Sequence, residues 1–386
     1  MLRKASAFVL VFAVSICALS NPSCAAQEKE PIKIGAIFAV TGGASFLGGP
    51  EAKTSEMMIE DINAKGGVLG RPLQLVIKNS EGSPEKAVAF AKQLIEEDKV
   101  VAIIGPSTSG ESLQIKGLCQ KAEIPLVSCA AAELIVNPIA SFVFKTPQND
   151  SFAAEKICAK IKASKLTKVG IVSANDGFGK AGRAQLQKLA PNAGLQIVAD
   201  EVYEKDATDL TAVITKLKAA GAEVVVNWSV VPAQSIIAKN MKQLAFNAPL
   251  YQSHGFGNIK YVEAAGAAAE GICFPCGRLL IAEALPENHP QRSLLVSYKQ
   301  SYEKRFGEAV STFGGHAYDA ILLVTAGLKK AGAADRAKLR DALEMLQGVI
   351  GTAGTFNLSA TDHNGLTIDA FDMLTVKDGK FVPCEK

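Results

Sequence analysis

The chain has 386 residues, of which 48% are hydrophobic, and its 41 lysines and arginines nearly balance 38 aspartates and glutamates. A formal net charge of +3, with no basic run interleaved with aromatic residues, argues against nucleic-acid binding. Because chains longer than about 250–300 residues usually divide into domains, two lobes are expected.

Residues 1–26 are predicted to form a signal peptide. Arg3 and Lys4 give the segment a basic start, and the apolar run over 5–19 is too short for a stable membrane anchor. Small residues around Cys24 offer a cleavage site, which predicts export to the periplasm. The residues before Cys24 lack the apolar pattern of acylated cysteines, so no lipid anchor is expected.

From Pro31 onward, short apolar runs typical of buried strands alternate with longer segments of helical periodicity. A first series predicts strands at 32–39, 73–78, 100–104 and 125–128, with helices at 52–63, 84–98 and 111–122. A second series predicts strands at 169–173, 196–202 and 224–228, with helices at 151–164, 180–189, 210–220 and 233–242. This alternation predicts parallel sheets between helices, and the two series predict an α/β fold of two doubly wound lobes.

The last part of the chain is less regular. Long helices are predicted at 292–306, 315–329 and 335–346, followed by a hairpin of strands at 370–377 and 380–382. The chain contains no solenoid-type repeat and no low-complexity tract, so these segments are expected to complete the two lobes.

The most informative stretch is the strand over 100–104 and the turn that follows it. Five apolar, mostly β-branched residues end at a Gly-Pro pair, and a helical pattern starts behind Ser107, Thr108 and Ser109. Free backbone amides and the helix dipole at such a helix start favour an anion. We interpret the stretch as the floor of a carboxylate site, with a simple helix N-cap as the alternative.

Two glycine motifs are similar to nucleotide-binding loops. Residues 105–112 match the phosphate-binding loop except that Glu111 replaces its lysine, and a carboxylate there would repel phosphate. Gly177 to Gly182 spell G-x-G-x-x-G after a predicted strand, as in NAD-dependent oxidoreductases. Phe178 stands where pyrophosphate needs close approach to the backbone, so this enzyme is only the alternative function. No histidine or serine lies in a hydrolase motif, and neither catalysis, a cofactor nor a metal is expected.

Six cysteines remain after the signal segment, and three of them lie in apolar patterns typical of core residues. Cys273 and Cys276 have the C-x-x-C spacing of redox and metal sites, but no second pair or nearby histidine pair completes a zinc site. Pairing with Cys384 in an oxidising compartment stays open.

Five motifs lie along residues 31–384. They are DINAKGGVLGRPL at 61–73, SPEKA at 83–87, IGP at 104–106, DGFG at 176–179 and YDA at 318–320. Together they resemble the leucine/isoleucine/valine-binding-protein family, whose members are extracytoplasmic receptors of ABC importers. The resemblance covers essentially all of these residues, and the first motif is the most specific.

This resemblance implies a type I periplasmic binding fold, in which two lobes joined by a three-segment hinge close on a ligand. The hinge crossovers are expected near Pro147, at 271–275 and at 353–356. The expected lobes are 31–147 plus 275–353 for lobe 1 and 148–272 plus 356–386 for lobe 2. A monomer that binds one solute and is recognised by a membrane permease is implied, and a sensory receptor domain is an alternative use of the fold.

The resemblance also implies a ligand pocket. Ser109 and the backbone amides of Ala130 and Ala132 match the positions that hold a carboxylate in relatives. His254 stands where the amino-acid-binding relatives have an acidic residue for the ligand's ammonium group. The remaining pocket positions are apolar or aromatic: Phe46, Leu47, Phe178, Trp228 and Val230.

The histidine decides the expected ligand. A neutral imidazole gives an ammonium group no full countercharge, and a buried unpaired ammonium is costly. The sequence therefore favours an amino-free aromatic or branched aliphatic acid, with His254 donating to a second oxygen. The alternative is a hydrophobic amino acid whose ammonium contacts backbone carbonyls or Asp176, although Asp176 also has the position of a helix cap.

Overall fold

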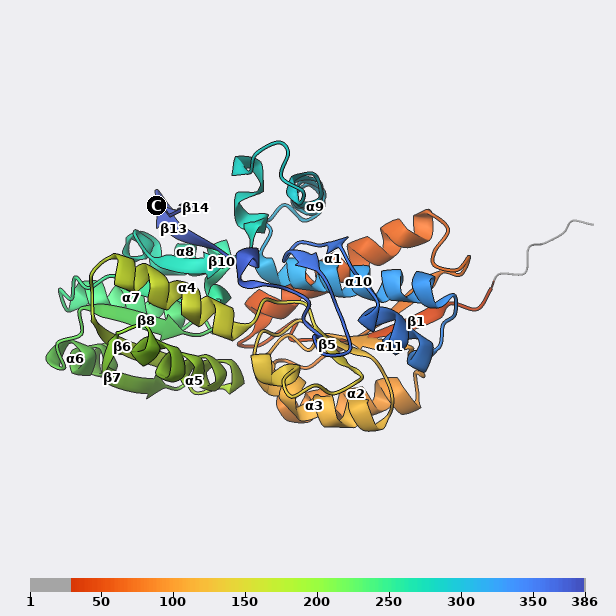
Figure 1. The fold of residues 1–386 in the computed structure, drawn as a ribbon, viewed down its shortest axis with the longest axis horizontal. Coiled ribbons are helices and arrows are strands. Elements are labelled where there is room, and N and C mark those ends of the chain that lie inside the picture. The colour runs from red at the N-terminus through yellow and green to blue at the C-terminus, as the bar shows by residue number, and fades with distance from the viewer. Residues whose placement is uncertain (1–28, 385–386) are drawn as a thin grey trace, which may run out of the picture.

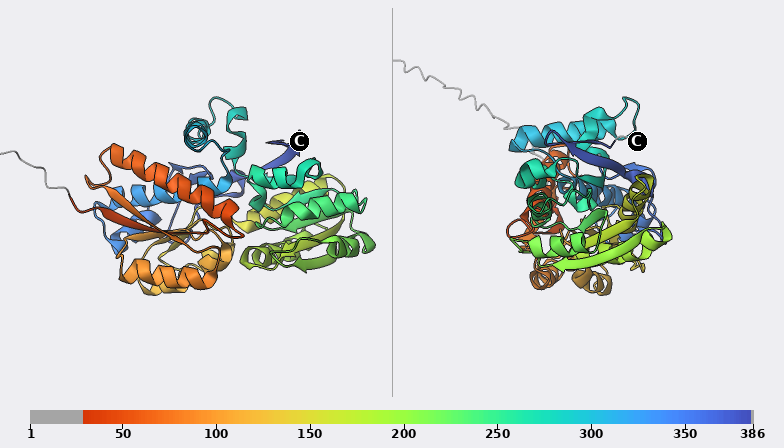
Figure 2. Two further views of the ribbon diagram at one scale, coloured as in Figure 1. Left: turned by 180° about the vertical axis from the view of Figure 1, so that it is seen from behind. Right: turned by 90° about the vertical axis from the view of Figure 1, so that its left-hand side faces the viewer.

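The computed structural model describes residues 29–384, which form two main β-sheets flanked by helices (Figure 1). The two sheets lie side by side along the long axis of the molecule, each with its own helices (Figures 1 and 2). The predicted signal peptide, including Cys24, lies outside the described residues. Within 29–384, no helix combines the length and the apolar character needed to cross a bilayer.

The first sheet has five parallel strands in the order β2-β1-β3-β4-β5. They are β1 (Ile32–Phe38), β2 (Leu73–Asn79), β3 (Ala102–Ile104), β4 (Leu126–Ser128) and β5 (Val143–Lys145). One face is covered by α1 (Ser45–Ala64), α10 (Thr312–Ala331) and α11 (Arg336–Glu344), and the other by α2 (Pro84–Glu96) and α3 (Ser109–Lys121). Alternate residues of β1 serve the two faces, since Ile34 packs in the first core and Ile37 in the second.

The second sheet has seven strands in the order β14-β13-β10-β9-β8-β6-β7. They are β6 (Lys168–Ala174), β7 (Gln196–Tyr203), β8 (Val224–Trp228), β9 (Leu250–Gln252), β10 (Cys273–Cys276), β13 (Asp372–Lys377) and β14 (Lys380–Pro383). Strands β6 to β10 are parallel. The predicted terminal hairpin adds β13 and β14 in antiparallel pairing beside β10. The helices of this lobe are α4 (Asp150–Ala163), α5 (Gly177–Asn192), α6 (Thr211–Ala219), α7 (Gln234–Gln243) and α8 (Ile259–Ala265).

The chain passes between the sheets three times. The first passage runs from the end of β5 to the start of α4 and contains Pro147. The second follows β10, so the expected crossover at 271–275 comes too early, because its last residues still pair in the second sheet. After it, α9 (Arg292–Phe306) packs on the short turn of 3-10 helix at Arg278–Ala284 and projects from the body (Figure 1).

The third passage lies later than the expected 353–356. The glycines that suggested a hinge there belong to a small hairpin of β11 (Val349–Ile350) and β12 (Thr355–Phe356). Leu358, Leu366 and Ala370 still pack in the core of the first sheet, and the chain rejoins the second sheet at β13. We propose lobes of residues 31–147 plus 277–371 and residues 148–276 plus 372–384.

Helix α1 begins at Ser45, several residues before the predicted start at 52. Gly48, Gly49 and Pro50 are weak helix formers, so the sequence pattern did not predict the first two turns of α1. Gly48 packs against the backbone of Ala39, where a Cβ atom would clash. This close approach brings the start of α1 to the interface between the lobes.

Candidate functional site

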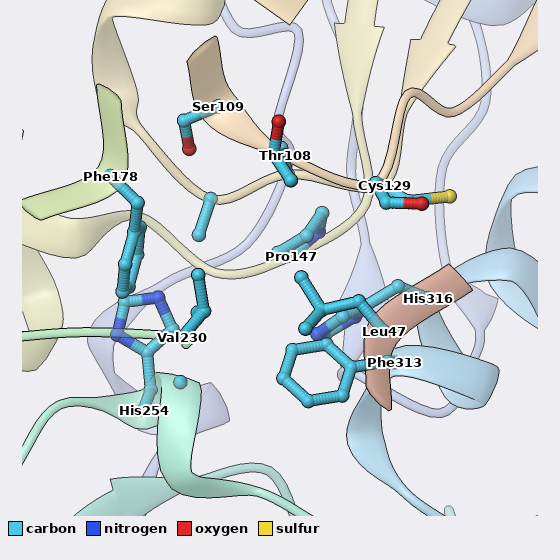
Figure 3. A pocket seen from close by; sticks show the side chains of 14 residues that line it. Leu47, Thr108, Ser109, Cys129, Pro147, Phe178, Val230, His254, Phe313 and His316 are labelled. Carbon is cyan, nitrogen blue, oxygen red and sulfur yellow. The ribbon is translucent and has the colours of Figure 1, made fainter. Parts of the chain in front are cut away.

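A small cavity lies between the lobes (Figure 3). Its walls come from turns after β3, β4, β5, β8 and β9 and from α1, α5 and α10, so it faces the carboxyl ends of parallel strands, where α/β folds bind ligands. The lining residues are Leu47, Ser107, Thr108, Ser109, Cys129, Ala130, Ala131, Pro147, Phe178, Val230, His254, Gly255, Phe313 and His316. Those expected from the sequence are Leu47, Ser109, Ala130, Phe178, Val230 and His254.

The start of α3, which was expected to hold a carboxylate, lines the cavity. Thr108 is the N-cap, and its hydroxyl and amide form a capping box with Glu111, so the helix start is fixed by the protein itself. Ser109 is the first helical residue, where backbone amides have no acceptor within the helix. The Ser109 hydroxyl accepts the Ala132 amide at 3.3 Å, which leaves its proton free to donate to an anion.

The loop after β4 differs from the expectation in its donors. The Ala130 amide donates to the Ser128 hydroxyl at 3.1 Å and the Ala132 amide donates to Ser109, so both expected carboxylate donors already have protein partners. Ala132 also does not line the cavity. Ala131 does, and its amide donates to no other residue within 29–384. The predicted loop is at the cavity, but its uncommitted amide is that of Ala131.

Lys145 lies buried behind this loop. Its Nζ donates to the carbonyls of Ala131 and Pro147 at 3.0 and 2.8 Å, which ties the loop to the first crossover. Burial lowers the pKa of Lys145 to about 7, and the Asp150 carboxylate opposes this shift. Lys145 therefore fixes the position of the Ala131 carbonyl beside the cavity.

His254 forms the wall of the second lobe. It sits in a short 3-10 turn (His254–Phe256) after β9, only 7% exposed. The rings of Phe178, Trp228 and Phe371 surround it, with centroids 5.3, 5.7 and 5.3 Å away. This burial lowers the pKa of His254 well below its usual range, so the imidazole is neutral. Neither ring nitrogen has a hydrogen-bond partner among the described residues.

Phe313 and His316 of α10 line the cavity from the first lobe and were missed in the sequence. The helix was predicted only from residue 315, because Gly314 and Gly315 interrupt its pattern. His316 is 7% exposed, and its Nδ1 has no partner within the described chain. Burial lowers its pKa to about 3. The feature of the sequence that could have indicated His316 as a site residue is that it is a single histidine in a mostly apolar helix.

Trp228 and Phe46 do not line the cavity, contrary to expectation. Trp228 is fully buried behind Phe178, with ring centroids 5.8 Å apart. Phe46 instead joins the lobes: its ring packs on Tyr261 at 5.4 Å, and its carbonyl accepts the Asn258 side-chain amide at 3.0 Å. Trp228 supports the wall and Phe46 contributes to closure.

The lining of the cavity contains no Asp, Glu, Lys or Arg side chain in the part of the chain that the structure describes. Asp176 caps α5 by accepting the Gly179 amide at 2.7 Å. It lines a larger outer groove, which shares Thr108, Phe178 and Val230 with the cavity. Asp176 is therefore outside the cavity and serves as a helix cap.

The glycines of the NAD-like motif are required by packing. A Cβ atom on Gly177 would come within 2.6 Å of Gly110 in α3, and one on Gly182 would clash with the Trp228 ring. Gly179 lies against the carbonyl at the end of β6. The motif therefore has a structural explanation that involves no pyrophosphate.

Comparison with known proteins shows the family to which the chain belongs. The family model of periplasmic binding proteins matches residues 31–380. Among curated relatives, Leu/Ile/Val-binding protein homolog 3 of Brucella melitensis is 27% identical, covering 94% of this chain and 95% of that protein. The leucine-, isoleucine-, valine-, threonine-, and alanine-binding protein of Pseudomonas aeruginosa is 26% identical, covering 86% of this chain and 87% of that protein.

Solved structures show the same fold. An extracellular ligand-binding receptor from Rhodopseudomonas palustris HaA2 is 26% identical with a TM-score of 0.86, covering 92% of this chain and all of that one. The substrate binding protein LivJ from Streptococcus pneumoniae, solved with isoleucine, is 26% identical with a TM-score of 0.80, covering 91% and 98%. The resemblance and the type I fold expected from the sequence are confirmed, and the chain belongs to the periplasmic binding protein family.

Proposed function

We propose that this chain is a periplasmic solute-binding protein of an ABC importer of the branched-chain-amino-acid type. It holds one small carboxylate-bearing solute between its lobes by hinge closure and presents the closed form to a membrane permease. The family match and the relatives named for leucine, isoleucine and valine binding support this role. Members of this class bind and release a solute unchanged, so no enzymatic activity is proposed.

The proposed ligand is an amino-free carboxylic acid with an aromatic or branched aliphatic body. One observation carries this proposal: the cavity has anion donors and apolar walls but no carboxylate. The Ser109 hydroxyl and the Ala131 amide bind the acid group, and Leu47, Phe178 and Phe313 enclose its body. His254 donates to a second oxygen.

A hydrophobic amino acid is the weaker candidate. Its ammonium group requires an acceptor of full negative charge or several well-placed oxygens when it is buried. Asp176 is committed to the α5 cap and lines the outer groove. The carbonyls of Ala131 and Pro147 already accept the Lys145 ammonium, which would repel a second cation nearby.

The single tryptophan provides the test, because Trp228 lies directly behind the His254 ring. Mature protein, freed of carried-over ligand by unfolding and refolding, is titrated with leucine, phenylalanine, benzoate and 4-methylpentanoate while Trp228 emission is followed. We expect saturation with the amino-free acids only. Saturation with leucine alone would contradict the ligand class, and no saturation with any probe would reject small carboxylates altogether.

A further inference from the structure

Three buried imidazole nitrogens around the cavity lack partners. They are Nδ1 and Nε2 of His254 and Nδ1 of His316. The two rings reach the cavity from different lobes, His254 from the turn after β9 and His316 from α10 (Figure 3). Because a buried polar atom without a partner is costly, three such atoms at one cavity indicate that a ligand supplies their hydrogen bonds.

The surroundings of both rings select an uncharged partner. Phe178, Trp228 and Phe371 surround His254, and Phe313 lies 6.5 Å from the His316 ring. Both imidazoles are neutral, and no side chain that lines this cavity carries a formal charge. A second carboxylate on the ligand would therefore be buried without a countercharge. A hydroxyl or oxo group needs only the lone pair or N–H that a neutral imidazole offers.

We propose that the ligand is a monocarboxylate bearing a second, uncharged oxygen function, a hydroxyl or an oxo group, that is bound between His254 and His316. This inference rests on the proposed function and narrows its substrate class. The carboxylate binds at the start of α3, and the second oxygen receives hydrogen bonds from both lobes. The pair of histidines thus makes selection of the ligand depend on closure.

Matched acids that differ by one oxygen test the inference. Titrations use benzoate against 4-hydroxybenzoate, 4-methylpentanoate against 4-methyl-2-oxopentanoate, and the dicarboxylate terephthalate. We expect at least one oxygenated acid to bind about tenfold or more tightly than its parent, since two buried hydrogen bonds are gained, and terephthalate to bind more weakly than benzoate. If the parents bind and neither oxygenated acid is tighter, the inference is wrong while the proposed function stands. If no acid binds, the proposed ligand class itself fails.

Variants assign the effect to the second histidine. His316→Leu should abolish the tighter binding of the oxygenated acid over its parent acid, in whichever matched pair shows it. His316→Gln, which keeps a hydrogen-bond donor and an acceptor, should restore much of this difference in affinity. His289→Ala is the control, since His289 is partly exposed and lies outside the cavity lining. An unchanged preference in a folded His316→Leu protein would overturn the role of His316.

A second inference comes from the cysteines. The Sγ atoms of Cys273 and Cys384 lie 3.3 Å apart, at the start of β10 and just after β14. Cys276, the other member of the C-x-x-C motif, is 1% exposed and belongs to the core. The Cys384 amide also donates to the Met373 carbonyl at 2.8 Å, which holds the end of the chain against the sheet.

We infer that Cys273 and Cys384 form a disulfide after export. Each thiol loses a proton, the sulfurs join, and the two electrons pass to the disulfide of a thiol–disulfide oxidoreductase, which becomes a dithiol. The bond fastens the terminal hairpin to β10. Alkylation of exported, unfolded but unreduced protein and peptide mass mapping test it. We expect a Cys273–Cys384 cross-linked peptide, and Cys384→Ser should free Cys273 for alkylation. Free thiols at both positions, or a Cys273–Cys276 link, would overturn the inference.

Discussion

At the residue scale, the chemistry of the cavity follows from side chains that are polar without being charged. His254 stands within aromatic rings, and the desolvation that lowers its pKa also prevents it from serving as a cation. Ser109 contributes one hydroxyl proton, because its oxygen already accepts the Ala132 amide. Lys145 lies behind the cavity wall and holds the Ala131 carbonyl in place. Together they suit one buried negative charge.

Replacing His254 by an acid should exchange the ligand class. In His254→Glu, two negative charges at about 5 Å would repel by roughly 3 kcal/mol at an effective dielectric of about 20, so affinity for amino-free acids should fall about a hundredfold. Leucine binding should appear, because its ammonium gains a partner. Calorimetric titration measures both. His254→Gln is the matched control and should retain affinity for amino-free acids, and equal losses in both variants would contradict the charge argument.

The buried neutral histidines should make the protein less stable in acid. An unfolded histidine takes up a proton below about pH 6.5, whereas His316, with a pKa of about 3, stays neutral in the fold. His316 therefore lowers the free energy of unfolding as pH falls from 6.5 towards 3. Above pH 6.5 it has almost no effect on stability, because the histidine is neutral in both states. Between pH 7 and 5.5, His316→Gln should reduce the loss of unfolding free energy by about 1 kcal/mol. Urea denaturation at both pH values measures it, and an unchanged pH dependence would exclude this account.

How far the sequence predicts the site depends on what fixes each side chain. Ser109 was expected because it follows a predicted strand and starts a helix, whereas His254 was expected from the resemblance to the family. Phe46 and Trp228 were expected in the lining. Phe46 instead packs on Tyr261 of the other lobe, and Trp228 packs behind Phe178. Such positions depend on tertiary packing, which the sequence pattern does not reveal. His316 was missed because tertiary contacts support a helix start that contains two glycines.

At the element scale, closure brings two helix starts together. The first turn of α3 in one lobe faces the first turn of α5 in the other, and they meet at Gly110 and Gly177. The glycine of α5 that resembles a nucleotide motif therefore serves the contact between lobes. Asn258 and Phe46 form a second contact between the lobes.

An alanine at one of these glycines should oppose closure. The Cβ of Gly177→Ala would lie 2.6 Å from the Gly110 backbone, whereas a Cβ on Gly110 would meet nothing closer than 3.8 Å. Overpacking of this kind costs about 1–3 kcal/mol, so Gly177→Ala should weaken ligand binding about tenfold or more. Gly110→Ala is the matched control and should change affinity only slightly. Circular dichroism confirms folding, and equal affinities of the two variants would contradict the closed contact.

Helices and strands could be predicted where the hydrophobic pattern extends over many residues. The buried strands β1, β6 and β8 and most helices agree with the sequence prediction within a few residues. Short strands such as β5, β9 and β10 carry too few residues for a pattern and are defined by pairing with neighbours. The third crossover was placed too early, because glycines of a tight hairpin are indistinguishable in sequence from those of a hinge.

At the scale of the whole molecule, the two lobes enclose a cavity that neither forms alone. Its lining comes from strand ends of both sheets, so a bound acid is shielded from water only when the lobes meet. Ligand selection and closure are therefore one event in this account. Among residues 29–384 the lining holds no Asp or Glu, which is what the proposed amino-free ligand requires.

The most direct measurement compares leucine with 4-methylpentanoate, which is leucine without its amino group. Both are titrated calorimetrically into refolded, ligand-free protein at pH 7. The account predicts that 4-methylpentanoate binds at least about tenfold more tightly than leucine. A buried ammonium without a countercharge should cost more than about 1.4 kcal/mol of binding free energy, which corresponds to a tenfold change in Kd. Tighter binding of leucine would contradict the central claim and would show that the neutral cavity can hold an ammonium group.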